Sequence, residues 1–334
     1  MAGLVPRTVK RLLGLALGSV AALLLAELGL RALGVVREVG APFSTWDAED
    51  GVRLRPSLRA TRHTPAFTMT LTTNREGWRG PEFGTAPAGT VLFLGDSYTM
   101  GYGVDDGGEF PALVARDLPA GVEMRNFGIG GTGNGRWLNV LDRELPRADA
   151  LVVVMQFTGN DLADNLVEGL CRITDTGDLE RCEPRPESRP RRMLRTVLEG
   201  VPLVADSHLM GMVRQLRFTR VQPPSRTGGN SSAGTPSLDL TMRIVEAALA
   251  RCGDEGVPVL GLGVELEPEQ ERRLRDLFAA RGATFLVSPT PTARPELFFA
   301  TDPHWNEAGH RWAAGQVASA LASEPYAARM RSAR

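Results

Sequence analysis

Two short motifs, one in the first third of the chain and one near its end, carry side chains suited to nucleophilic catalysis. Gly95-Asp96-Ser97 directly follows a short apolar run, and Asp302-Pro303-His304 precedes the last helical pattern. A serine nucleophile needs a base to take its proton, and histidine serves best at neutral pH. An acid two residues before that histidine can fix its tautomer and stabilise the imidazolium. We therefore expect Ser97 to be the nucleophile, His304 its base and Asp302 the acid that orients His304.

The chain holds four histidines, and His304 is the best placed of them to act as a base. His63 lies in an N-terminal segment and His208 in a long insertion. His310 follows His304 by six residues on the last predicted helix. A single histidine on a helix is more often structural than catalytic, so we expect a structural function for His310.

Two loops could supply hydrogen-bond donors to a developing oxyanion. Residues 126–133 form a glycine-rich loop after the second predicted strand and can aim a backbone N–H at the site. Asn160 follows the third predicted strand within Gly159-Asn160-Asp161, and its side-chain amide is a second donor. The backbone N–H of Ser97, at the start of a predicted helix, is a third.

The same glycine-rich loop also fits a nucleotide-binding pattern. Gly128, Gly130 and Gly133 match Gly-x-Gly-x-x-Gly. The loop follows the second predicted strand and not the first, however, and no acid ends the next strand to hold a ribose. Lys10 is the only lysine in the chain, which excludes a P-loop. We therefore favour the oxyanion function over nucleotide binding.

Short apolar runs alternate with helical patterns from residue 90 onward. The runs are 91–94, 122–127, 150–157, 257–264 and 284–287, and the helical patterns are 109–118, 137–144, 238–253, 267–281 and 307–321. Nearly continuous apolar strands separated by helices are typical of a parallel sheet covered on both faces. We predict an α/β fold with a parallel sheet of about five strands, and a catalytic domain over residues 90–325.

Two other segments lie outside this alternation. Residues 37–89 are rich in Pro, Gly, Thr and Arg. They predict a linker with a small β-rich segment, here called the apron, which includes a strand at 67–71. This composition indicates no chemistry by itself. Residues 165–237 are far longer than an ordinary connection. This insertion, with a basic run at 181–195 and helical spacing at 194–218, is either a lid or recognition flap or a mobile surface segment.

Three cysteines are too few for a disulfide-built scaffold. Cys171 and Cys182 could bridge a loop of the insertion if the domain faces an oxidising compartment. Cys252 lies in a helical pattern and is expected to be a buried thiol. We see no cysteine pair or histidine-rich cluster that suggests a metal site, and we expect no cofactor.

The N-terminal residues 1–36 predict a membrane anchor. Arg7, Lys10 and Arg11 precede an apolar run at 12–26, and apolar character continues to residue 36 despite Glu27 and Arg31. A spanning helix needs about 20 mostly apolar residues, and basic residues on its N-terminal side keep that end in the cytoplasm. The alternative is a cleaved signal peptide, because the strongest run is short. Either predicts export of the catalytic domain.

In order along the chain, the motifs resemble the four blocks of the SGNH (GDSL-like) hydrolase family, membrane-anchored bacterial type. The matching positions are Gly95-Asp96-Ser97, the Gly131 loop, Gly159-Asn160-Asp161 and Asp302-Pro303-His304. The resemblance implies a flavodoxin-like three-layer α/β/α sandwich with Ser97, His304 and Asp302 as a triad. It implies an oxyanion hole made of the Ser97 N–H, the Gly131 N–H (Gly130 being the alternative) and the Asn160 side chain.

The function that we expect is hydrolysis of acyl esters, chiefly acetyl esters, on an envelope or exported polysaccharide. A glycan O-acetyltransferase that draws acetyl groups from a membrane partner would use the same triad, and a non-catalytic glycan-binding scaffold is the third alternative. Arginines of the insertion would suit an anionic glycan, or they form a solvated charge run. A net charge of −1 argues against a nucleic-acid partner.

Overall fold

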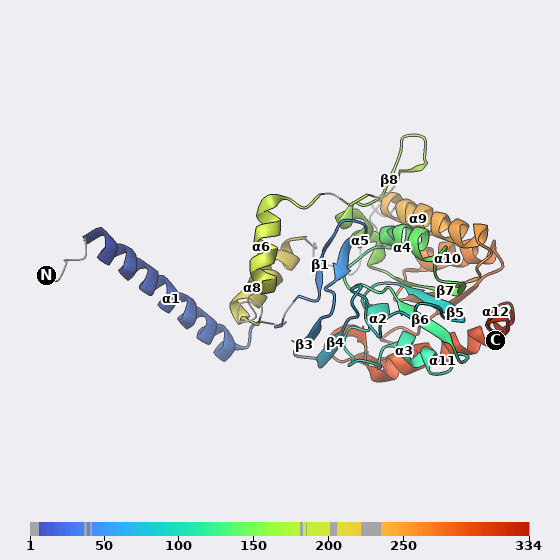
Figure 1. Cartoon of the computed structure of the whole chain (residues 1–334), viewed down its shortest axis with the longest axis horizontal. Coiled ribbons are helices and arrows are strands. Elements are labelled where there is room, and N and C mark those ends of the chain that lie inside the picture. The colour runs from blue at the N-terminus through green and yellow to red at the C-terminus, as the bar shows by residue number, and fades with distance from the viewer. Residues whose placement is uncertain are drawn as a thin grey trace.

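The computed structural model describes residues 7–36, 39–40, 42–180, 183–184, 186–200, 206–221 and 235–333. At its centre lies a parallel sheet of five strands in the order β11-β10-β7-β5-β6 (Figure 1). The strands are β5 (Gly89–Leu94), β6 (Val122–Asn126), β7 (Ala150–Thr158), β10 (Val259–Val264) and β11 (Thr284–Val287). The first strand of the sheet thus lies between the second and the third, as in flavodoxin-like folds. The predicted fold class is confirmed.

Helices cover both faces of this sheet, because its strands are apolar on both sides. Leu92 and Leu94 of β5 belong to one core cluster, and Val91 and Phe93 belong to the other. The helices on the first face are α4 (Trp137–Glu144), α9 (Thr235–Asp254) and α10 (Pro268–Ala279); those on the second are α3 (Phe110–Ala115), α11 (Glu307–Leu321) and α12 (Tyr326–Ser332). Figure 1 shows these two layers above and below the sheet.

The last helix, α12, begins just beyond residue 325, where we expected the catalytic domain to end. Tyr326 is buried in the second core cluster, and its hydroxyl donates to the Val259 carbonyl at 2.8 Å. The same hydroxyl accepts the Thr284 N–H at 3.1 Å. Helix α12 therefore packs against the edge of the central sheet.

Two antiparallel strand pairs make up the segment before the sheet. They are β1 (Ser44–Asp47) with β2 (Gly51–Leu54), and β3 (Arg59–His63) with β4 (Thr68–Thr72). Burial alternates along β3 and β4, so one face of this hairpin packs inward. Met69 and Leu71 of β4 belong to the same core cluster as the central sheet. The apron is thus continuous with the main core.

The insertion begins within α5 (Asp161–Glu168) and continues away from the sheet. Its other elements are β8 (Arg172–Ile173), β9 (Leu179–Glu180), α6 (Arg189–Gly200) and α8 (His208–Val221). The helical spacing at 194–218 therefore falls on two helices, α6 and α8. Arg195 of the basic run pairs with Glu187 at 2.9 Å and donates to the Thr45 hydroxyl at 3.1 Å. This arginine holds α6 against the apron.

The structure describes two of the three cysteines, Cys171 and Cys252. Cys171 is disulfide-bonded, while Cys182, its expected partner, lies outside the described residues. Cys252 is free and buried, as predicted. Burial raises the pKa of the Cys252 thiol to about 12, so this thiol is un-ionised at neutral pH.

The N-terminal helix α1 (Arg7–Leu33) projects away from the catalytic domain (Figure 1). Residues 8–33 are long and apolar enough to cross a membrane, and their leucines are exposed. An apolar helix near the N-terminus fits a membrane anchor and also a signal sequence. Its end contacts the insertion, because Ser207, His208 and Leu209 at the start of α8 all bond to Glu27.

Candidate active site

Ser97 begins the short helix α2 (Ser97–Met100) immediately after β5, at the carboxyl edge of the sheet. The Asp96 carboxylate caps this helix by accepting the Tyr98 N–H at 2.9 Å. The turn before it requires glycine, because a β-carbon on Gly95 would lie 2.5 Å from the Gln156 side-chain oxygen. This geometry leaves the Ser97 side chain half-buried at the head of a helix, where its backbone N–H points outward.

His304 and Asp302 reach the same point from the other end of the chain. Both lie on β13 (Asp302–Trp305), which pairs with β12 (Phe298–Phe299) after the short helix η2 (Pro295–Leu297). His304 Nε2 lies 2.8 Å from Ser97 Oγ, and His304 Nδ1 lies 2.6 Å from Asp302 Oδ1. The structure therefore brings the three expected triad residues into one hydrogen-bonded chain.

The Asp302 carboxylate is ionised in this arrangement. Burial raises its pKa, but the hydrogen bonds and the charge of His304 outweigh burial and lower the pKa below its ordinary value. Asp302 Oδ1 also accepts the His304 backbone N–H at 3.0 Å, which fixes the turn between the two residues. A charged, immobile Asp302 keeps a proton on Nδ1 and leaves the Nε2 lone pair facing Ser97.

The glycine-rich loop passes directly beside Ser97 and leads into the short helix η1 (Asn134–Arg136). A β-carbon on Gly130 would lie 3.5 Å from that of Ser97, and Gly131 is exposed with φ of +70°. A β-carbon on Gly128 would lie 2.2 Å from the Met100 nitrogen of α2. A β-carbon on Gly133 would lie 2.3 Å from the side-chain oxygen of Asn165 on α5 (Asp161–Glu168). Close packing against α2 and α5 therefore accounts for Gly128 and Gly133 without a nucleotide.

Asn160 lies at the N-terminal end of α5, at the same edge of the sheet as Ser97. Its side chain is exposed and donates to the Asp164 carboxylate at 2.7 Å. An amide nitrogen carries two hydrogens, so a second one remains for another acceptor. The contact with Asp164 fixes the direction of this amide.

Arg79 is a functional residue that sequence reasoning missed. It lies in the apron, yet its side chain is fully buried beneath α2, the helix that begins with Ser97. Its guanidinium donates to the Met100 and Gly101 carbonyls at 2.9 and 2.7 Å and to the Val104 carbonyl at 2.8 Å. The first two are carbonyls at the end of α2, where a helix leaves its carbonyls unpaired, and the third lies in the loop beyond it. Arg79 therefore holds the C-terminal end of α2, and with it the position of Ser97.

Glu265 is a second residue that the sequence did not reveal. It follows β10 with φ of +50°, which is uncommon for a residue with a side chain. Burial raises the pKa of its carboxyl above the ordinary value, and the charge of His304 and a hydrogen bond from Tyr98 offset part of that rise. The one hydrogen of the Tyr98 hydroxyl is shared between Glu265 and the Pro303 carbonyl, which lies 2.8 Å from the hydroxyl oxygen. Tyr98 and Glu265 thus support the turn that carries His304.

His310 has the structural position expected for it. Its Nδ1 accepts the Phe110 N–H at the start of α3, 3.2 Å away, and the ring is fully buried. Burial lowers the pKa of His310 to about 3, and the positive charges of Arg79 and His304 act in the same direction. The folded protein therefore holds this imidazole neutral.

This neutral histidine predicts a pH dependence of stability. The pKa is 6.5 for an ordinary histidine and about 3 in the folded chain, so unfolding takes up a proton between these values. The free energy of unfolding should therefore be highest above pH 6.5 and should fall as the pH is lowered. His310 contributes up to about 1.4 kcal/mol per pH unit to this fall. Denaturant titrations at pH 6.5, 5.5 and 4.5 should show a shallower fall for His310→Gln. Parallel curves for the two proteins would contradict this assignment.

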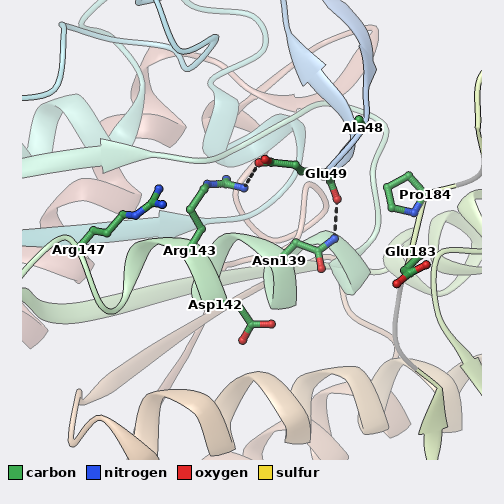
Figure 2. Close-up of a pocket in the computed structure, with 8 residues that line it drawn as sticks. All are labelled: Ala48, Glu49, Asn139, Asp142, Arg143, Arg147, Glu183 and Pro184. Carbon is green, nitrogen blue, oxygen red and sulfur yellow. Dashed lines mark hydrogen bonds and ion pairs between the residues drawn. The ribbon is translucent and has the colours of Figure 1, made fainter.

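A hollow of about 490 Å³ lies elsewhere, along α4 (Figure 2). The Glu49 carboxylate pairs with Arg143 across it, and the Glu49 carbonyl accepts the Asn139 amide at 2.8 Å. Its lining comes from the β1–β2 turn, from α4 and from residues 147 and 183–184. Ser97 lies on α2 and His304 on β13, so this hollow is not where the two residues meet.

A family model described as the GDSL-like lipase/acylhydrolase family matches residues 93–312. This range contains Ser97, Gly131, Asn160, Asp302 and His304. No curated protein matches the chain.

Several solved structures are similar over most of their length. The lipase/acylhydrolase from Enterococcus faecalis is 15% identical with a TM-score of 0.39, and the match covers 70% of this chain and 95% of that one. TesA is 15% identical with a TM-score of 0.41, covering 71% and 99%. A carbohydrate acetylesterase family member from Sinorhizobium meliloti is 13% identical with a TM-score of 0.34, covering 70% and 97%.

Proposed function

Since the chain belongs to the GDSL-like lipase/acylhydrolase family and is an SGNH-type hydrolase, we propose that Ser97, His304 and Asp302 are its catalytic triad. The observation that carries the proposal is the hydrogen-bonded chain from Ser97 Oγ through both ring nitrogens of His304 to Asp302 Oδ1, with distances of 2.8 and 2.6 Å. These distances are within the range for a nucleophile, its base and an orienting acid.

The reaction follows from the positions of the protons. Ser97 Oγ attacks the ester carbonyl while His304 Nε2 takes its proton, and the ring becomes an imidazolium beside the Asp302 carboxylate. The tetrahedral intermediate then expels the alcohol, which receives that proton from Nε2. Water attacks the acyl-enzyme with His304 again as base, and the acid and free Ser97 are released.

The negative charge of the tetrahedral intermediate needs donors beside Ser97. We assign this task to the backbone N–H groups of Ser97 and Gly131 and to the side-chain amide of Asn160. Support comes from the glycine loop, which passes beside Ser97, and from Asn160, which lies at the same sheet edge. The loss of one such donor typically costs about 10²–10³ in kcat.

We further propose that the substrate is an acyl ester, chiefly an acetyl ester, on an envelope or exported polysaccharide. The family supports ester hydrolysis, and the apolar helix α1 supports a location at a membrane. Basic residues precede α1 at positions 7, 10 and 11, which favours a cytoplasmic N-terminus and an extracytoplasmic catalytic domain.

Product analysis of the full chain in detergent tests this function. With an acetylated polysaccharide as donor and an unacetylated oligosaccharide as acceptor, we expect free acetate to accumulate, and Ser97→Ala to release none. Acetyl incorporation into the acceptor without acetate release would show a transferase. Folded protein that produces neither product would refute the proposed activity.

Glu27 supports retention of α1 as an anchor. Its carboxylate accepts the Ser207 hydroxyl at 2.7 Å and the His208 and Leu209 N–H groups at 2.9 Å each. It thereby caps the start of α8 together with the Ser207 hydroxyl, which accepts the Leu209 N–H at 3.1 Å. Cleavage of α1 would remove the part of this cap that Glu27 supplies. The intact mass of the protein purified from membranes should include α1; a mature chain that begins after residue 33 would contradict retention.

A further inference from the structure

Three aromatic rings lie together beside His304. The Tyr102 ring is 4.9 Å from that of His304, and the Phe67 ring is 5.1 Å from that of Tyr102. The Phe299 ring follows at 4.8 Å from Phe67. All three side chains are half-buried, so the cluster is not part of the closed core. We call Phe67, Tyr102 and Phe299 the aromatic platform.

The apron hairpin brings Phe67 to this place and holds it there. The Thr70 N–H donates to Asp105 at 2.7 Å, and the Thr72 N–H donates to Asp106 at 2.9 Å. These two aspartates lie in the loop that follows the nucleophile helix. The hairpin edge is therefore fastened to that loop by charge-assisted hydrogen bonds, and the Phe67 ring has a fixed position relative to Ser97.

Gly103 allows Phe299 to complete the platform. This glycine has φ of +107°, and a β-carbon on it would lie 2.5 Å from the edge of the Phe299 ring. Its N–H also faces the Met69 sulfur of the hairpin at 3.1 Å. The platform is thus assembled from three separate segments packed closely around one turn.

The position of the platform decides which part of an ester it contacts. His304 Nε2 must reach the leaving oxygen in order to return the proton to it. The alcohol portion of the substrate therefore lies next to the His304 ring, while the acyl chain hangs from the carbonyl carbon on Ser97. The row of rings begins with Tyr102, which contacts His304, and continues through Phe67 to Phe299. It consequently borders the leaving alcohol and not the acyl chain.

We propose that the aromatic platform binds the pyranose ring of the leaving alcohol. When an O-acetyl group is removed from a sugar, the leaving alcohol is the sugar itself, and its flat face of C–H groups packs well on an aromatic face. This inference rests on the triad proposed above. It identifies the substrate class through the alcohol and assigns the recognition to residues that the four family motifs do not contain.

The test compares three acetate esters with the full chain in detergent. They are a methyl mono-O-acetylglucopyranoside, phenyl acetate and ethyl acetate, whose leaving alcohols are a sugar, an aryl ring and a small alcohol. Phe67→Leu keeps an apolar side chain but removes the flat face. We expect KM for the sugar ester to rise about tenfold with kcat retained, and both constants for ethyl acetate to stay unchanged. Phe67→Trp, which keeps a flat aromatic face, should keep the low KM of the wild type for the sugar ester.

Phe83→Leu is the matched control, because Phe83 is another half-buried apron ring that packs on Phe127, away from His304. It should leave all three esters unaffected. Equal losses on every ester in Phe67→Leu, or a loss confined to phenyl acetate, would overturn the sugar platform. An unchanged KM for the sugar ester would overturn it too. A wild-type chain that cleaves none of the esters would instead refute the triad, so the two failures are distinguishable.

Discussion

Replacing His304 with alanine should lower kcat for p-nitrophenyl acetate by roughly 10⁴- to 10⁶-fold. His304 is within hydrogen-bond distance of Ser97 Oγ and has Asp302 behind it, so its loss removes the base, the acid for the leaving group and the link to Asp302 together. Steady-state hydrolysis by the purified full chain measures this effect. Circular dichroism of the variant establishes that it is folded.

Two comparisons make this prediction specific. The double variant Ser97→Ala/His304→Ala should be no slower than the worse single variant, because residues that act as one unit do not contribute additively. His208→Ala should retain the wild-type kcat, since this histidine lies at the start of α8, beside Glu27. A fully active His304→Ala, or losses that multiply in the double variant, would contradict a shared function of Ser97 and His304.

Arg79→Met should destabilise the protein by about 3–5 kcal/mol, the usual range when one partner of a buried charge pair is removed. Its guanidinium is fully buried, bonds three carbonyls after the nucleophile helix and lies 3.5 Å from the buried Glu109. The substitution keeps the length of the side chain but removes the charged donor of the three carbonyls and the charge partner of Glu109. Denaturant unfolding followed by tryptophan fluorescence measures the loss, and kcat should fall as α2 loosens.

Arg75→Met is the control for this prediction. Arg75 lies four residues earlier in the same segment and pairs with Glu82 at 2.8 Å, but both side chains are at least half exposed. Exposed ion pairs of this kind contribute about 0–1 kcal/mol. Equal stabilities of Arg79→Met and Arg75→Met would show that burial beneath the nucleophile helix has no special importance.

The central sheet was predictable because its strands are short and apolar throughout. Residues such as Val91 and Leu92 are buried on opposite faces of β5, which makes the run continuous and unlike an exposed strand. The catalytic motifs were visible for a related reason. Turns after such strands need special residues, so Gly95 and Asp96 mark the position of Ser97.

The supporting residues were not predictable in this way. Arg79 lies 21 to 25 positions in the sequence from its carbonyl partners, and Glu27 lies 181 positions from His208. Neither periodicity nor a local motif links residues so far apart, because their meeting depends on the packed tertiary structure. The apron therefore looked like a segment without chemistry, although the structure places Arg79 beneath Ser97 and Phe67 beside the rings at His304.

The central claim is that Ser97 is the nucleophile, and covalent labelling tests it most directly. The full chain is treated with an alkyl phosphonofluoridate, which phosphonylates activated serines, and the modified residue is located by peptide mass spectrometry. We predict a single adduct on Ser97 that forms in step with loss of esterase activity and forms far more slowly in His304→Ala. An active enzyme labelled at a different serine, or inactivated with Ser97 unmodified, would contradict the account.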